Sequence, residues 1–170
     1  MKKKFFIIFF ILFAFSYYTS IYLYNLQNSI ASKVIRFHVI ANSDSTFDQA
    51  LKLKVRDKTV EYLTPILENS KNINECRKII EKNIYNIENL AIQTLAEFCD
   101  YTVKAELTNS NFPTKSYEDY SFPAGNYEAL KITIGEGQGQ NWWCVMFPPL
   151  CLPAVTAEAE DSVYGVFGEN

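Results

Sequence analysis

The sequence has a single histidine, His38, and its four cysteines form no Cys-x-x-Cys pair. Structural zinc sites take four ligands, usually closely spaced cysteines and histidines, so we expect no metal site. Glycine is also scarce, with six residues in 170. Gly135, Gly137 and Gly139 alternate in one loop that lacks the spacing, lysine and hydroxyl of a phosphate-binding loop. We therefore expect no cofactor.

Basic residues are too few for a nucleic-acid-binding protein. The chain has 16 lysines and arginines against 19 acids, for a net charge of −3. Residues 1–31 hold three lysines and no acid, so the remainder carries a net charge of −6. Nucleic-acid-binding domains usually display a basic patch. We expect no nucleic acid partner.

A long apolar run lies at the N-terminus. Lys2, Lys3 and Lys4 precede an apolar segment from Phe5 to Leu26, which spans 22 residues. This length is enough to cross a bilayer, and a basic leader before an apolar run is typical of an export signal. Ser29-Ile30-Ala31 has the small-x-small form of a cleavage site. Residues 1–31 are thus a membrane anchor or a cleaved signal peptide, and in both cases the rest of the chain is exported.

Export makes disulfides possible. Cys144 and Cys151 enclose the shortest loop, in which Pro148-Pro149 turns the chain, so we expect them to pair. Cys76 and Cys99 form either a second bridge or two small apolar core residues.

Local patterns predict two helices after a first strand. Residues 33–40 are rich in β-branched and aromatic side chains, which favours a strand. The polar cluster 42–45 follows, and a helix begins at Ser45 or Thr46 and is brought to an end by Pro65 and Asn69. We expect the charged side chains of this helix to lie largely on its solvent side; they are Lys52, Lys54, Arg56, Asp57 and Lys58. A second helix of about 26 residues begins at Asn72, with apolar residues three and four apart.

The second half predicts strands. Residues 101–107 alternate as a strand, 108–113 form its turn, and 115–121 are a short extended or irregular piece. Residues 127–134 and 141–147 are strands joined by the glycine loop, most simply as a hairpin. These elements indicate an α+β domain over 32–153, with a largely antiparallel sheet and two helices packed on one face. The acidic tail 154–170 has no clear pattern.

Candidate catalytic residues are few. His38 with Cys144 and Asn42, or with Asp44, offers the residue types of a hydrolase. Cys144, however, lies in an apolar strand, whereas nucleophilic cysteines favour electropositive surroundings. No pair of carboxylates is singled out among Asp44, Asp48, Glu128 and Glu136. We expect no enzymatic activity and no small-molecule substrate; an extracytoplasmic hydrolase and a cell-wall-binding module remain the alternatives.

Trp142 and Trp143 are adjacent on a predicted strand, so their side chains point to opposite faces of the sheet. We expect at most one to pack on the core and the other to face solvent, a groove or a partner, unless the C-terminal tail or Tyr117 and Tyr120 cover it. The turn 42–45 is a second candidate surface, with helix capping as its alternative role. The candidate partner-binding residues are Asn141, Trp142, Trp143, Phe147, His38, Asn42 and Asp44.

Three segments carry a resemblance to a known family. They are IRFHVIANSDS (35–45), DQALKLKVRD (48–57) and the stretch from FPAG (122–125) to NWWCVMFPPLC (141–151). Together they resemble the stage II sporulation protein R family over residues 33–151. The sequence after Pro153 matches no pattern of that family.

The resemblance implies a signalling protein of endospore formation without known enzymatic activity. Family members are exported across the forespore membrane into the space between the two cells. There they activate a membrane-embedded aspartic protease of the mother cell, which then processes pro-sigma-E. We hypothesise that the hairpin from Trp142 to Cys151, held by its disulfide, docks on the extracytoplasmic part of that protease and favours its active or dimeric state.

Overall fold

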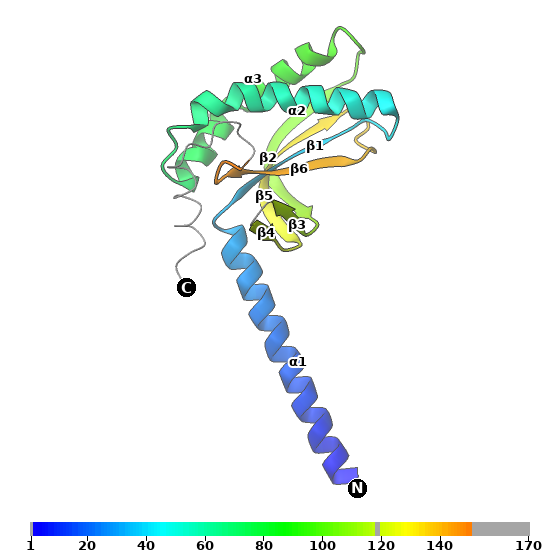
Figure 1. The fold of residues 1–170 in the computed structure, drawn as a ribbon, viewed down its shortest axis with the longest axis vertical. Helices are drawn as coiled ribbons and strands as arrows, with labels where there is room; N and C mark the ends of the chain where they lie inside the picture. The colour runs from blue at the N-terminus through cyan, green and yellow to red at the C-terminus, as the bar shows by residue number, and fades with distance from the viewer. Residues whose placement is uncertain (1, 118–119, 151–170) are drawn as a thin grey trace.

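The computed structural model describes residues 2–117 and 120–150. A long helix, α1, leads into an α+β domain, which confirms the predicted fold class (Figure 1). The elements in chain order are α1 (Lys2–Ala31), β1 (Ile35–Ile40), α2 (Thr46–Leu67), α3 (Ile73–Leu95), β2 (Val103–Phe112), β3 (Lys115–Tyr117), β4 (Tyr120–Phe122), β5 (Gly125–Ile134) and β6 (Asn141–Phe147).

Four strands form the main sheet, in the order β2-β5-β1-β6. β1 runs parallel to β5 and antiparallel to β6, while β2 runs antiparallel to β5. The predicted hairpin of β5 and β6 is wrong, because β1 lies between them. The glycine loop therefore crosses the end of β1 instead of closing a two-stranded ribbon.

The burial of β1 on both faces explains its central place. Ile35, Phe37 and Val39 point to the helices, and Arg36 and His38 point to the opposite face, yet all five are buried. A strand that is covered on both faces needs neighbours on both edges to satisfy its backbone groups. β5 and β6 provide those neighbours.

The two helices begin at the predicted caps. Ser45 Oγ accepts a hydrogen bond from the Asp48 amide, and Asn72 Oδ1 accepts one from the Glu75 amide. These bonds satisfy amides that have no partner within the helix. Pro65 does not end α2, which continues to Leu67, and α3 ends at Leu95.

Several details of the sequence reading are wrong. Lys52 is buried, and its ammonium group donates to Gln49 and to the Gln140 carbonyl, which compensates for the water that the charge has lost. The polar stretch expected as a turn after residue 107 belongs to β2, where Asn109 pairs with Glu128. By contrast, the piece expected to be extended or irregular does contain extended segments, β3 and β4, which form a separate two-stranded sheet.

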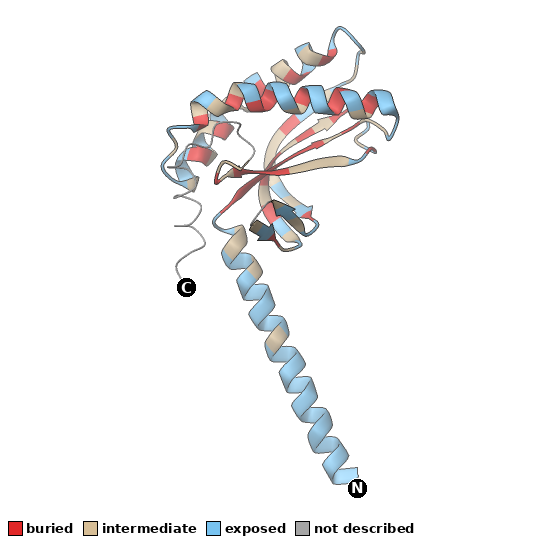
Figure 2. Cartoon of the chain, viewed as in Figure 1, coloured by how far each residue is buried: buried red, intermediate tan, exposed pale blue. Residues whose placement is uncertain are grey.

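The domain has two hydrophobic clusters, one on each face of the main sheet. The larger lies between the sheet and helices α2 and α3, and includes Phe37, Leu63, Ile80 and Ile132. Figure 2 shows the buried residues along the central strands and on one side of α2. The second cluster lies on the opposite face and consists of Val34, Phe112, Phe122, Tyr127, Ala129 and Val145.

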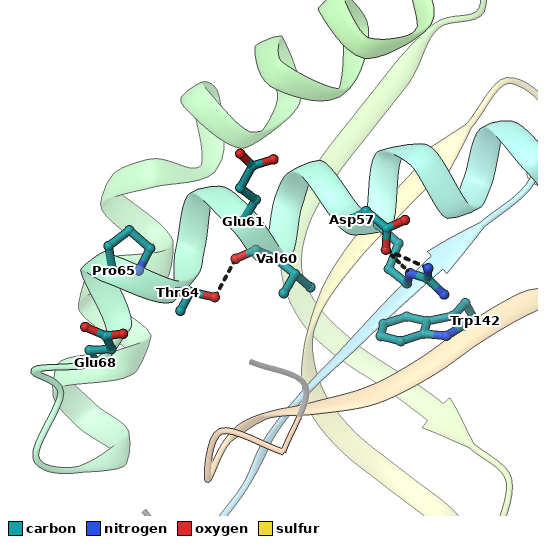
Figure 3. A pocket seen from close by; sticks show the side chains of 8 residues that line it. Asp57, Val60, Glu61, Thr64, Pro65, Glu68 and Trp142 are labelled. Atoms are coloured by element: carbon teal, nitrogen blue, oxygen red, sulfur yellow. Dashed lines mark hydrogen bonds and ion pairs between the residues drawn. The ribbon is translucent and has the colours of Figure 1, made fainter. Parts of the chain in front are cut away.

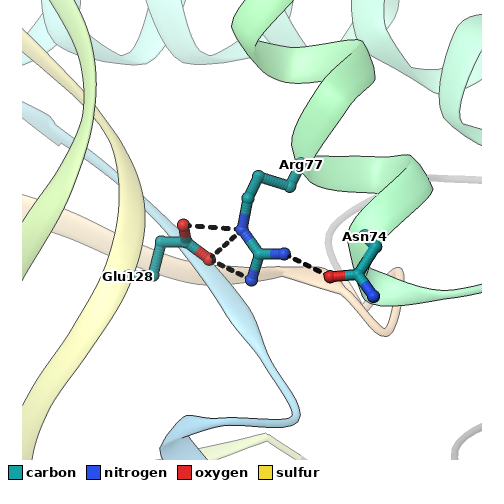
Figure 4. Close-up of polar contacts among 3 residues, drawn as sticks. All are labelled: Asn74, Arg77 and Glu128. Carbon is teal, nitrogen blue, oxygen red and sulfur yellow. Dashed lines mark hydrogen bonds and ion pairs between the residues drawn. The ribbon is translucent and has the colours of Figure 1, made fainter.

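An ion pair fastens α3 to the sheet (Figure 4). Arg77 donates from Nε and Nη2 to the carboxylate of Glu128 on β5, at distances of 2.8 to 3.0 Å. Arg77 Nη1 also donates to Asn74 at 2.6 Å. The Glu128 carboxylate raises the pKa of Arg77. A forked arginine–carboxylate pair fixes orientation as well as distance.

Helix α1 is exposed along its apolar length. By its length and composition, this helix could cross a membrane. Its last turns touch the domain. Gln27 Nε2 donates to the Asn126 carbonyl at 3.3 Å, and Ile30 and Ala31 pack against the second cluster. Gly125 leaves room for Gln27, since a Cβ there would lie 2.3 Å from Gln27 Nε2. The end of α1 is therefore part of the folded unit.

The cysteines are partly accounted for. Cys76 and Cys99 are both free thiols, so the second bridge is not formed. Cys76 is buried, and its burial raises the pKa of the thiol to about 12. Cys151, the expected partner of Cys144, lies outside the described residues, as does the tail 154–170. The pairing of Cys144 with Cys151 stays a prediction.

Candidate functional site

The candidate residues lie at three separate places. Trp142 and Phe147 pack on the helix side of β6, against the larger cluster. Trp143, Asn141 and His38 lie together on the opposite face. Asn42 and Asp44 lie in the loop after β1. The structure thus brings together some of the predicted residues but not all.

Trp142 forms one wall of an open groove between β6 and α2 (Figure 3). Its ring meets the ring of Phe37 edge-on, with centroids 5.6 Å apart, and the Arg56 guanidinium lies 5.1 Å from its centre. Arginine over an indole is a favourable cation–π arrangement. We call this feature the Trp142 groove; it has a volume of about 600 Å³ and is lined by Arg56, Asp57, Val60, Glu61, Thr64, Pro65, Glu68 and Trp142.

The polar groups of the Trp142 groove are partly engaged with one another. Arg56 Nε and Nη2 both bind Asp57 Oδ1, at 2.7 and 2.6 Å. The Thr64 hydroxyl donates to the Val60 carbonyl at 2.7 Å. Glu61 pairs with Lys58 at 2.7 Å at an exposed position, where such a pair contributes little. Arg56 and Thr64 therefore use hydrogen-bond donors in contacts within the protein.

Trp143 packs on the other face of the sheet. Its indole is parallel to the imidazole of His38, with ring planes 5° apart and centroids 5.0 Å apart. Phe112 lies 4.6 Å from Trp143 and 5.1 Å from His38, centroid to centroid. Both tryptophans are half-buried, so each packs on a cluster and neither is left wholly to solvent.

His38 is buried, with 4% of its surface exposed. Its Nδ1 lies 3.1 Å from Oδ1 of Asn141, an amide and not a carboxylate. Loss of water around the ring lowers the pKa of His38 to about 4, because a charged imidazole is poorly solvated there. The histidine is thus neutral near pH 7.

The hydrolase arrangement is not assembled around His38. Cys144 pairs with Phe37 across β1 and β6, so its side chain lies on the helix face, whereas His38 lies on the opposite face. Asp44 uses its Oδ1 to accept from the Gln140 amide at 2.7 Å. Within residues 2–117 and 120–150, no three His, Cys, Asp or Glu side chains are grouped for a metal.

Asn42 and Asp44 connect the loop after β1 to the glycine loop through hydrogen bonds. Asn42 Nδ2 donates to the buried Asp48 carboxylate at 2.9 Å, and its Oδ1 accepts from the Glu136 amide at 2.9 Å. The Gly139 amide donates to the Ala41 carbonyl at 2.9 Å. Hydrogen bonds from Ser43 and Asn42 lower the pKa of Asp48. This loop joins β1, α2 and the glycine loop, in addition to capping the helix.

Arg36 is a buried cation that the sequence analysis did not single out. Its guanidinium lies 4.2 Å from the centre of the Phe112 ring and 5.0 Å from that of Tyr127, and Nη2 donates to the Tyr117 hydroxyl at 3.1 Å. Burial lowers the pKa of Arg36, because a charged group loses hydration there. Among the described residues, the groups around this charge are aromatic rings and not acidic side chains.

The α2 side of the Trp142 groove was also missed. The helical spacing predicts Arg56 on the solvent side of α2, and the sequence indicates for Pro65 only the end of a helix. Nothing in the sequence spacing links these residues to Trp142, since the contact depends on where β6 lies in the sheet. The exposed flank of α2 is visible only once the strand order is known.

Comparisons with known proteins point to one family. The family model described as "Stage II sporulation protein R (spore_II_R)" matches residues 31–157. The chain is 40% identical over 123 residues to "Stage II sporulation protein R" of Bacillus subtilis (strain 168). The match covers 72% of this chain and 55% of that relative, so the chain spans little more than half the length of the curated relative. No solved structure matches.

The family match covers the domain and the end of α1, including both tryptophans, the loop 42–45 and the Trp142 groove. The chain belongs to the stage II sporulation protein R family.

Proposed function

We propose that this chain is an exported signalling protein of endospore formation that activates a membrane-embedded aspartic protease and so triggers pro-sigma-E processing. The family supports the role in sporulation. The protease, the sigma factor and the route across the forespore membrane come from the resemblance of the sequence.

One observation carries the proposal: the end of α1 packs against the domain through Gln27, Ile30 and Ala31. A helix of 30 residues is about 45 Å long, which exceeds the roughly 30 Å of a bilayer core. Lys2 to Lys4 favour the cytoplasmic side. A domain held at the outer surface by such a helix meets the extracytoplasmic segments of a membrane-embedded partner.

Activation then needs only preferential binding. A ligand shifts a conformational equilibrium to the extent that it binds one state better than the other. The Trp142 groove supplies a surface for this, with an indole on one side and the Val60 and Pro65 side chains among charged residues of α2 on the other. Tryptophan is enriched among residues that dominate binding energy. No catalytic residue of this chain takes part.

The test is pro-sigma-E cleavage in cells that express the mother-cell protease and the precursor, with and without this chain. We expect cleavage only when the chain is present and reaches the outer face of the membrane. Trp142→Leu should reduce cleavage strongly, and a variant that lacks residues 1–31 should fail.

Two controls make the result interpretable. The thermal unfolding of Trp142→Leu shows whether the domain still folds, because Trp142 also packs on Phe37. Activity of the purified chain on peptidoglycan and on peptides tests the hydrolase alternative. If the chain is located outside the membrane and cleavage does not occur, the proposed function is wrong.

A further inference from the structure

The Trp142 groove has an apolar part on each side. Val60 and Pro65 line it from α2 and Trp142 lines it from β6, and Trp142 and Val60 continue into the larger cluster. Apolar side chains that line an open groove favour a partner that supplies an apolar side chain of its own. The groove is thus suited to a segment of protein.

The rim of the groove carries more acceptors than donors. Asp57, Glu61 and Glu68 line it with three carboxylates, against the single cation of Arg56. Arg56 is already bound to Asp57 and lies over Trp142. The formal charge of the lining is therefore −2, and it is −1 when Lys58, which pairs with Glu61 from outside the lining, is included.

Pro65 adds a further acceptor. Proline has no amide hydrogen, so the Glu61 carbonyl lacks the donor that residue i+4 provides elsewhere in a helix. The carbonyl belongs to a residue that lines the groove. Such a carbonyl is satisfied by water or by a donor from a bound molecule. Lysine and arginine side chains supply donors and the complementary charge together.

We propose that the Trp142 groove binds a cationic and apolar segment of the membrane-embedded partner, with an apolar side chain against Trp142 and a lysine or arginine at the rim formed by Glu61 and Glu68. This inference rests on the proposed function for the identity of the partner. Charge argues against the chain's own tail as the occupant, because residues 151–170 carry four acids and no lysine or arginine.

The selectivity of the groove is testable without the protease. The full chain in an uncharged detergent is titrated with two labelled eight-residue peptides, one with a leucine and two lysines and one with glutamates in place of the lysines. Fluorescence anisotropy reports binding, with empty micelles as the blank. We expect the lysine peptide to bind at least about tenfold more tightly, a difference that corresponds to about 1.4 kcal/mol.

Charge reversal locates the binding. The double variant Glu61→Lys, Glu68→Lys should bind the lysine peptide at least about tenfold more weakly and should bind the glutamate peptide more tightly. Glu97→Lys with Asp100→Lys makes the same change in net charge at exposed positions after α3, and should leave both affinities within about twofold. Equal binding of the two peptides, or no effect of reversal at Glu61 and Glu68, overturns the inference.

Photo-crosslinking identifies the occupant. Benzoylphenylalanine replaces Thr64 in the groove, and in a matched control replaces Tyr85, which is exposed on α3. In sporulating cells we expect the Thr64 position to capture a protease segment that contains lysine or arginine. Capture of residues 151–170 or of a second copy of the chain overturns the inference.

The two proposals fail in different ways. If pro-sigma-E is processed but the protease crosslinks away from the groove, the inference is wrong and the proposed function stands. If processing never depends on this chain, the proposed function is wrong, and the peptide titration still decides whether the groove selects cationic segments.

Discussion

His38 and Trp143 face each other across β1 and β6 with their rings parallel and 5.0 Å apart. The stack leaves the histidine buried, and its Nδ1 meets the side-chain oxygen of Asn141. A residue that looks like a catalytic base in the sequence is instead held neutral inside an aromatic layer. Its protonation is therefore coupled to the stability of the domain.

We expect the free energy of unfolding to fall on mild acidification. The folded-state pKa of His38 is about 4, below its ordinary value of 6.5, so the unfolded chain binds more protons between these values. The contribution of His38 to the free energy of unfolding is fully present above about pH 6.5 and decreases as the pH falls to about 4. Below pH 4 this group causes no further loss. The loss is on the order of 3 kcal/mol. Denaturant unfolding at a series of pH values measures it.

His38→Gln is the matched variant. It removes the titrating group, so the slope between pH 6.5 and pH 4 should largely disappear, whatever the variant's absolute stability. An unchanged slope in His38→Gln would show that other groups control the pH dependence.

The ion pair of Arg77 and Glu128 should stabilise the attachment of α3 to β5. Its side chains are 30% and 27% exposed, so the pair is only partly shielded from solvent. A double-mutant cycle with Arg77→Met and Glu128→Gln should give a coupling of about 1 kcal/mol. The exposed pair of Lys58 and Glu61 is the control, with a coupling below about 0.5 kcal/mol. Equal couplings for the two pairs would contradict this ranking.

Gly135→Ala should destabilise the joined loops. Gly135 has a φ of 54°, and a Cβ there would lie 2.2 Å from Oδ1 of Asn42. The strain and the collision together should cost about 2 kcal/mol or more. In an Asn42→Ala background only the Cβ of residue 42 remains near the new Cβ, at 3.1 Å, so the collision is largely relieved and the same substitution should cost only about 1 kcal/mol. Chemical denaturation of the four proteins tests whether the two effects are non-additive.

Gly125→Leu should loosen α1 from the domain without unfolding it. The new side chain must displace Gln27, which is flexible, so we expect the stability of the domain to change by less than about 1 kcal/mol. Trypsin should then cleave after the exposed Lys33 several times faster than in the parent chain. Asn126→Ala is the control, because Gln27 binds the backbone carbonyl of that residue. Equal cleavage rates in all three proteins would show that the contact does not restrain the junction.

The sequence predicted elements with strong local signals. Ser45 and Asn72 begin the two helices, and the polar Asn141 and the proline at 148 limit β6 at the expected residues. Each of these depends on neighbouring residues alone. This is why the fold class, the starts of the two helices and the bounds of β6 were predictable.

The strand order and the Trp142 groove were not predictable in this way. Arg36 and His38 alternate with apolar residues along β1 and so resemble a solvent-facing side. Both are buried because aromatic rings from β2, β5 and β6 cover them. Only that long-range packing makes β1 central, places β6 beside α2, and thereby creates the groove.

The central place of β1 has a consequence for the order in which the chain folds. Arg36 pairs with Ala129 on one edge of β1 and with Val145 on the other. β1 is made early, yet both of its neighbours come from the last part of the described chain. The main sheet cannot close until β6 has been synthesised, since contacts between distant residues form only after both are present. Until then β1 lacks the strand that pairs with one of its two edges, and the domain cannot complete its core on that side.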